Sequence, residues 1–123
     1  MKTLVIMALA ALFAVAPQNT QPTPDDFEIL SDKTEGGIRT IVAKPVMVCS
    51  KQITIKVDAK TNIIQSAVFL RGCDGNLKAI NILVKGMTVQ EVVRKLYGVD
   101  CGGRGTSCTD QLARILKRAY KLK

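Results

Sequence analysis

Two short strand-like segments joined by a turn constrain the fold of this chain more than any other feature of its sequence. In residues 51–58, KQITIKVD, apolar and polar residues alternate strictly, which is typical of a strand with one buried face. Residues 63–70, IIQSAVFL, are strand-like again, and the intervening AKTN is rich in turn-forming residues. The pattern predicts an antiparallel β-hairpin.

The remaining regular segments add one strand and three helices. IRTIVA, residues 38–43, predicts a strand. Apolar residues then follow helical spacing in residues 76–86 and 88–98, and the second of these segments opens with a capping box. A last helix is expected from about Thr109. We therefore expect an α+β domain, in which a small antiparallel sheet, the hairpin plus one strand, packs on three helices.

The sequence is expected to divide into three parts. Residues 1–16, MKTLVIMALAALFAVA, resemble a signal peptide, because the apolar run is shorter than the ~20 residues of a membrane span. Export follows if this segment is cleaved, with no stable membrane span left afterwards, and a cytoplasmic location follows otherwise. Residues 17–37 begin with a Pro-, Gln- and Thr-rich stretch and are expected to form a linker or extension. The folded domain is expected to cover residues 38–123.

Four cysteines flank the expected chain reversals. Cys49 lies just before the hairpin and Cys73 just after it, so antiparallel pairing brings both to the same end of the sheet. Cys101 and Cys108 bracket a loop whose glycines let it fold back tightly. A cluster of four thiols at one end is therefore expected. Because the chain has no histidine, any metal site must use cysteines or carboxylates.

Spacing alone leaves three chemical states of these cysteines open. They could form a tetrathiolate zinc or iron–sulfur site, two structural disulfides of an exported chain, or a dithiol redox centre. Cys108 stands at the start of the last helix, with Ser107 or Thr106 as the expected cap. There the unpaired N–H groups and the helix dipole favour the thiolate, so we expect a lowered pKa for Cys108.

The loop between the last two cysteines offers a possible phosphate site. Gly102, Gly103 and Gly105 would expose backbone N–H groups beside Arg104, at the start of a helix. The alternative is a tight loop with one solvated arginine.

The formal net charge of +8 favours an anionic partner or, alternatively, a solvated basic face. Much of this charge lies on the last helix, where cations near the C-terminal end complement the helix dipole. The expected apolar stripe of this helix is Leu112, Ile115, Leu116 and Ala119, and its opposite face holds Arg114, Lys117, Arg118 and Lys121.

The segments GCDGNL, LVKGM, CGGR and TSCTDQLA occur in this order between Arg71 and Ala113. In this order they resemble the TSCPD domain, with Thr109 where the family motif has proline. With VCSKQI included, the resemblance covers about residues 38–123 and is closest to small members with four cysteines. Such domains also occur in the C-terminal region of vitamin B12-dependent ribonucleoside-diphosphate reductases. A fainter likeness is to U-type iron–sulfur cluster scaffolds, whose ligand positions match Cys49, Cys73 and Cys108.

These resemblances imply an accessory domain of ribonucleotide reduction, which is the synthesis of deoxyribonucleotides, acting through a four-cysteine metal or thiol site. The expected ligands of zinc or of an iron–sulfur cluster are Cys49, Cys73, Cys101 and Cys108. The expected partners are a reductase subunit or a nucleotide, and nucleic acid is not expected. A chain of 123 residues cannot form the catalytic barrel or a cobalamin site, so cobalamin would enter only through the partner reductase. The alternatives are a zinc or iron–sulfur carrier unrelated to the reductase and a disulfide-stapled exported binding domain.

Overall fold

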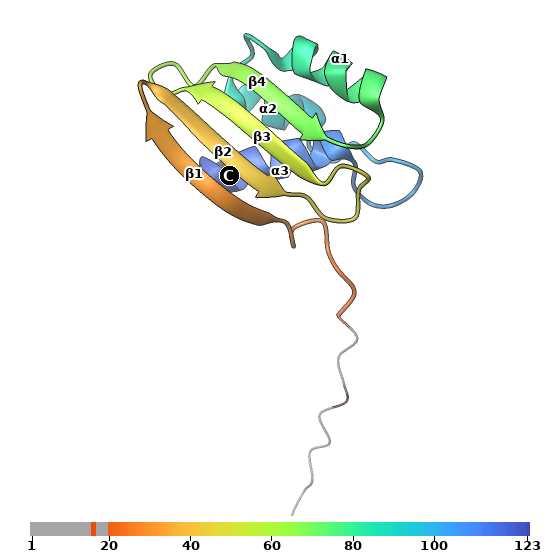
Figure 1. The fold of residues 1–123 in the computed structure, drawn as a ribbon. Helices are drawn as coiled ribbons and strands as arrows, with labels where there is room; N and C mark the ends of the chain where they lie inside the picture. Colours follow the sequence, from red (N-terminus) through yellow and green to blue (C-terminus); the bar gives the residue numbers. More distant parts are fainter. Residues whose placement is uncertain (1–15, 17–19) are drawn as a thin grey trace, which may run out of the picture.

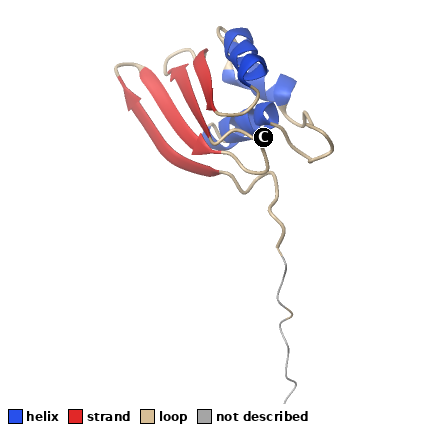
Figure 2. Cartoon of the chain, turned by 45° about the vertical axis from the view of Figure 1, so that its right-hand side comes forward, coloured by secondary structure: helices blue, strands red, loops and turns tan. Residues whose placement is uncertain are grey.

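The computed structural model describes residue 16 and residues 20–123. The expected signal-peptide segment, residues 1–16, therefore lies almost wholly outside the described residues. The described chain forms one layer of β-sheet and one layer of helices on a single face of that sheet (Figures 1 and 2). This confirms the α+β architecture. The elements are β1 Glu28–Glu35, β2 Ile38–Lys44, β3 Gln52–Asp58, β4 Ile64–Leu70, α1 Asp74–Val84, α2 Val89–Leu96 and α3 Cys108–Ala119.

The predicted hairpin is β3 and β4, which pair antiparallel with Gln52 opposite Leu70. The carboxylate of Asp58 accepts hydrogen bonds from the amides of Lys60 and Thr61, and these bonds hold the turn. The alternating pattern has the predicted consequence, because one face of β3 is fully buried against the helices. Its buried side chains are Ile53, Ile55 and Val57.

The sheet has one strand more than expected, in the order β1-β2-β3-β4 with antiparallel pairing throughout. β1 lies inside residues 17–37, so the assignment of that whole stretch to a linker is wrong. The composition concealed this edge strand because most of its side chains are exposed and polar. A two-residue turn at Gly36 and Gly37, both with positive φ, joins it to β2. Phe27, just before β1, is only 4% exposed and belongs to the core.

Helix α3 packs under the centre of the sheet and supplies much of the core. Leu112, Ile115 and Leu116 are fully buried, as the predicted apolar stripe requires. Helix α2 lies beside α3 and begins with the predicted capping box, in which Thr88 and Glu91 exchange hydrogen bonds of 3.1 Å. The sequence therefore predicted the capped start of α2 and the buried stripe of α3.

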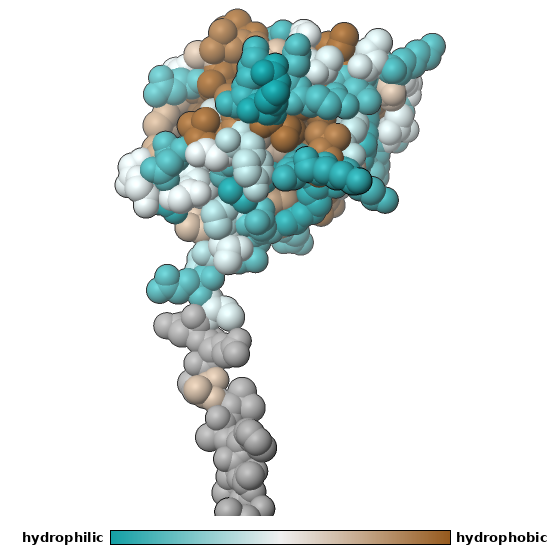
Figure 3. Space-filling model, turned by 180° about the vertical axis from the view of Figure 1, so that it is seen from behind, coloured by the Kyte–Doolittle hydropathy of each residue, from teal (hydrophilic) through white to brown (hydrophobic). Residues whose placement is uncertain are grey.

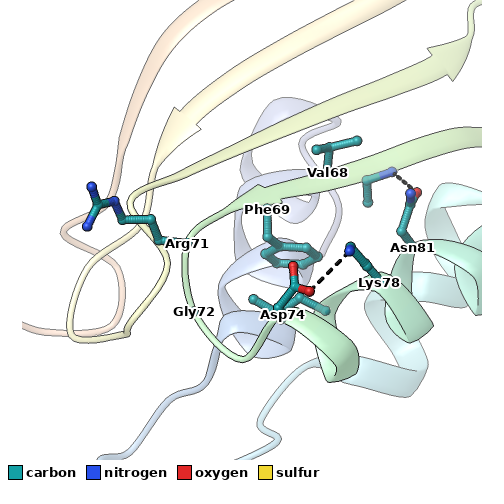
Figure 4. Close-up of a pocket in the computed structure, with 9 residues that line it drawn as sticks. Val68, Phe69, Arg71, Gly72, Asp74, Lys78 and Asn81 are labelled. Carbon is teal, nitrogen blue, oxygen red and sulfur yellow. Dashed lines mark hydrogen bonds and ion pairs between the residues drawn. The ribbon is translucent and has the colours of Figure 1, made fainter.

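Helix α1 lies along the free edge of β4. The side-chain oxygen of Asn81 accepts a 2.9 Å hydrogen bond from the amide of Ala67, an edge group that has no partner strand (Figure 4). The helix thereby covers an edge on which another strand could otherwise pair. Its outer face keeps Ile82 and Leu83 more than 60% exposed. Within the described part of the chain, no helix is both long enough and apolar enough to cross a membrane.

Candidate thiol and metal site

Two cysteines far apart in the sequence meet where the hairpin approaches α3. Cys49 lies just before β3, and Cys108 is the first residue of α3. Their sulfur atoms are 3.6 Å apart and share a hydrogen bond. Cys49 is exposed, whereas Cys108 is 9% exposed. Packing of α3 against the sheet therefore creates a half-buried pair of thiols.

The other two cysteines lie at the exposed border of this pair. Cys73 occupies the N-cap position of α1 without a side-chain capping hydrogen bond, and its amide and thiol both lower the pKa of the nearby Cys49, a proximity expected from the hairpin. Cys101 is held differently, because its amide donates to the carbonyl of Thr106 and closes the glycine loop. All four cysteines are free thiols. No hydrogen bond of the described residues joins the sulfur of Cys101 to the other three.

Gly72 leaves the space that lets the hairpin end approach Cys49. Its φ is +107°, a conformation that residues with a side chain rarely adopt. A Cβ at this position would lie 2.7 Å from Leu77 Cδ1 and 3.2 Å from the sulfur of Cys49. An open pocket of about 210 Å³ between β4 and α1 begins at the same glycine (Figure 4). The first glycine of the GCDGNL motif is therefore required by close packing beside the thiol.

The pKa of Cys108 is shifted in the opposite direction to the one expected from its position at the helix N-terminus. Burial raises the pKa of Cys108, and the adjacent Cys49 sulfur raises it further, although the hydroxyl and amide of Ser50 act in the opposite direction. The hydrogen bond from Cys108 lowers the pKa of Cys49, and Cys73 adds to that effect. The prediction of a lowered pKa at Cys108 is thus wrong, because loss of water outweighs the position at the helix N-terminus. Within this pair, the opposite directions of the two pKa shifts favour ionisation of Cys49 over Cys108.

A buried polar network anchors the start of α3. The Ser107 hydroxyl caps the helix by accepting from the Asp110 amide at 3.0 Å, as predicted for this residue. The fully buried Asp110 carboxylate accepts from the Gly98 amide and the Thr106 hydroxyl, both at 2.6 Å. It also pairs with Arg114 at 2.7 Å. This network joins the end of α2, the glycine loop and α3, so it fixes the position of Cys108.

Gln111 links the start of α3 to the segment that carries Cys49. Its side-chain oxygen accepts from the Val46 amide at 3.0 Å, and its side-chain nitrogen donates to the Pro24 carbonyl and the Thr106 hydroxyl. The side chain is fully buried. The TSCTDQLA segment contains Asp110 and Gln111, but the sequence alone predicted no role for either residue. The available signal was the presence of two polar residues on the buried side of an amphipathic helix.

The glycine loop already holds an anionic group of its own. The Asp100 carboxylate accepts hydrogen bonds of 2.6 Å from the amides of Gly103 and Gly105. Both amides belong to the predicted phosphate site, which also includes Gly102 and Arg104. A phosphate would have to displace this carboxylate.

The sulfur pair is compatible with two chemical states, a zinc-bound pair of thiolates and a free dithiol. Two sulfurs of a tetrahedral zinc site are about 3.8 Å apart, given Zn–S bonds of about 2.3 Å. The 3.6 Å separation of Cys49 and Cys108 is close to that value and longer than a disulfide bond. The buried Ser50 hydroxyl, which has no hydrogen-bond partner apart from its approach to Cys108, supplies a donor of the kind that metal-bound thiolates accept.

A complete metal site requires the outer cysteines to move inward. Among residue 16 and residues 20–123, no group of three or more Cys, Asp or Glu side chains already surrounds one point. Cys73 and Cys101 are both exposed, and each has a glycine neighbour with positive φ, at Gly72 and Gly102. Thiolates are donors that suit zinc or iron, but among the described residues only the Cys49 and Cys108 sulfurs are already within bonding range of one such ion.

A comparison with protein-family models matches residues 24–120 to the model described as TSCPD domain. The matched region begins before residue 38, where the domain was expected to start, and includes β1. Comparisons with curated proteins and with solved structures found no match.

Proposed function

Because the chain belongs to the TSCPD domain family, we propose that it is a small accessory domain of ribonucleotide reduction that acts through a metal-binding thiol site. The observation that carries the proposal is the 3.6 Å approach of the Cys49 and Cys108 sulfurs. These residues come from different elements, and a buried polar network of the family motif holds the second of them in place. Such a network is expected where the position of a thiol matters to function.

Each cysteine has a distinct part in the proposed site. Cys49, whose pKa is lowered, would supply a thiolate ligand, and Cys108, whose pKa is raised, would have to release its proton to act as a ligand. Cys73 and Cys101 complete the set from exposed positions. When bound, zinc supplies a structural cross-link between the hairpin, the glycine loop and α3. Zinc is the ion we favour over an iron–sulfur cluster, because the 3.6 Å separation of the Cys49 and Cys108 sulfurs is close to that of two ligands on a single tetrahedral ion.

The proposed role is accessory because the chain is too small for the reductase reaction itself. With 123 residues it cannot enclose a radical reaction in a barrel. Cobalamin, where the reductase uses it, would belong to the partner subunit.

Metal analysis of the untagged full chain, purified without added metal, tests the site directly. We expect close to one zinc ion per chain, and we expect Cys49→Ser and Cys108→Ser each to abolish binding. Cys101→Ser is the matched comparison, because it removes an exposed sulfur from outside the central pair. It should weaken zinc binding without abolishing it, and circular dichroism should show that all three variants fold. Full metal content in Cys108→Ser would refute the proposal.

The same sulfur pair supports a dithiol function as the second candidate. Cys49 and Cys108 already share one hydrogen bond, so a small movement forms a disulfide. Intact mass after mild oxidation and alkylation separates the candidates, because a dithiol loses two hydrogen atoms and then resists alkylation. A brown colour after anaerobic reconstitution with iron and sulfide would instead indicate a cluster carrier.

The link to ribonucleotide reduction needs a separate test. The tagged chain should retain ribonucleoside-diphosphate reductase subunits on a column, and Cys49→Ser should retain less. Recovery of the reductase no higher than with an unrelated basic domain would contradict the link, whatever the metal content.

A further inference from the structure

The C-terminal half of α3 borders an open pocket that the thiol site does not use. The pocket has a volume of about 450 Å³ and lies between the segment before β1, the end of α2 and the end of α3. Cys108 begins the same helix, so the pocket lies toward the opposite end of α3 from the thiols. Figure 3 shows this helical face, on which hydrophilic side chains lie beside apolar surface. The charged and aromatic residues Asp25, Tyr97, Arg114, Lys117, Arg118 and Lys121 line this pocket.

Internal contacts account for two of the four cations that line this pocket. Arg114 pairs with Asp110 at 2.7 Å and with Asp25 at 2.8 Å, so its charge is neutralised. Arg118 donates to the carbonyls of Asp25 and Phe27, which fixes the guanidinium but leaves its charge without a carboxylate. Anchoring of the N-terminal segment therefore explains why these arginines are present.

The two lysines have no such structural role. No ion pair among the described residues includes Lys117 or Lys121. Lys117 lies in the last turn of α3, and Lys121 follows the helix end with a positive φ, but both line the pocket. Together with Arg118 they place three uncompensated positive charges in one pocket, which favours a ligand with several negative charges.

The pocket also offers an aromatic surface. Tyr97 is 42% exposed, and the cations of Arg114 and Lys117 lie over its ring, 4.4 and 4.8 Å from the ring centre, so a base would contact the part of the ring that these side chains leave open. The Asp25 carboxylate, at the pocket border, would repel a bare polyphosphate but could accept hydrogen bonds from sugar hydroxyls. One ligand class has parts that match all three features. Its base suits the tyrosine ring, its sugar hydroxyls suit the carboxylate, and its phosphates suit the cations.

We propose that this pocket binds a nucleoside polyphosphate. The phosphates contact Lys117, Arg118 and Lys121, the base lies against Tyr97, and the ribose hydroxyls donate to Asp25. The site differs from the predicted phosphate loop, in which the Asp100 carboxylate already accepts hydrogen bonds from two backbone amides. The inference names a ligand for the proposed accessory role, but its test does not depend on metal content.

Calorimetric titration of the full chain with ATP, in about 0.15 M salt so that weak surface attraction is screened, tests the proposal. We expect saturable binding of one ATP per chain. Replacing Lys117→Gln together with Lys121→Gln should weaken it about tenfold, as expected for two exposed charge contacts. The matched control is Lys33→Gln with Lys56→Gln, which makes the same charge change at an open pocket formed by β-strand residues.

The identity of the ligand is tested with tripolyphosphate as a second probe. ATP should bind more tightly than tripolyphosphate, and Tyr97→Leu should remove most of that difference. Urea denaturation should show that each variant folds. The proposal is overturned if ATP does not saturate, if the control pair weakens binding as much as the site pair, or if tripolyphosphate binds as tightly as ATP.

Discussion

Replacement of Gln111 by methionine tests whether the polar network positions the thiol pair. Methionine has nearly the same length and volume but cannot donate or accept in the same way. The change removes three hydrogen bonds, to the Val46 amide, the Pro24 carbonyl and the Thr106 hydroxyl. It also leaves the Val46 amide without its partner.

The expected loss of stability follows from these contacts. Three hydrogen bonds at about 1 kcal/mol each give a loss of about 3 kcal/mol. Burial of a more apolar side chain returns about 1 kcal/mol. The free energy of unfolding should therefore fall by about 2 kcal/mol, which is a large part of the 5 to 15 kcal/mol typical of a domain.

Urea denaturation of the full chain measures this loss, with Gln90→Met as the matched control. Gln90 is an exposed residue of α2, so its replacement should change the free energy by less than about 0.5 kcal/mol. A second readout is the yield of cross-linking between Cys49 and Cys108 with a short bifunctional alkylating reagent, which should fall in Gln111→Met alone. If Gln111→Met behaves like Gln90→Met in both assays, the positioning role is refuted.

Three further predictions concern single residues. Thr88→Ala removes half of the capping box and should lower the free energy of unfolding in urea by about 1 kcal/mol; no loss would mean that the cap is redundant. Burial raises the pKa of Tyr120, so its contribution to stability is present below the unfolded value of 10.0 and is lost as pH rises through the higher folded value. Tyr120→Phe should abolish that alkaline loss in pH-dependent denaturation and be close to neutral at pH 7, since among the described residues the hydroxyl has no hydrogen-bond partner apart from its approach to Arg39. The hydrogen bonds from Arg39 lower the pKa of Asp32, so wild type should be more stable than Asp32→Asn above pH 3.8, and this advantage should vanish as pH falls through the lower folded value. An advantage that persists in acid would contradict this assignment.

Local sequence patterns were sufficient to predict the strands and helices that bury one regular apolar face. The alternation in residues 51–58 predicted β3 because one strand face is buried. The apolar spacing of α3 predicted its buried stripe, and the positions of Thr88 and Glu91 predicted the cap of α2. β1 was missed because an edge strand buries little and therefore carries no clear alternation.

The candidate site could be predicted only in part. The sequence placed Cys49 and Cys73 at one end of a hairpin, since antiparallel pairing makes that a local result. It could not predict the 3.6 Å contact between Cys49 and Cys108, because that distance depends on how α3 packs against the sheet. It also did not reveal that Asp100 binds the amides of its own loop.

By itself, the sequence determined the strands of the hairpin, the amphipathic helices and the presence of thiols at chain reversals. Only the tertiary structure decided which thiol of the pair is favoured to ionise. A local argument from the helix N-terminus favoured Cys108, but burial raises the pKa of that residue and its hydrogen bond lowers the pKa of Cys49. The physical reason is that loss of water and contacts between distant segments arise only when the whole chain packs, and no local pattern encodes them.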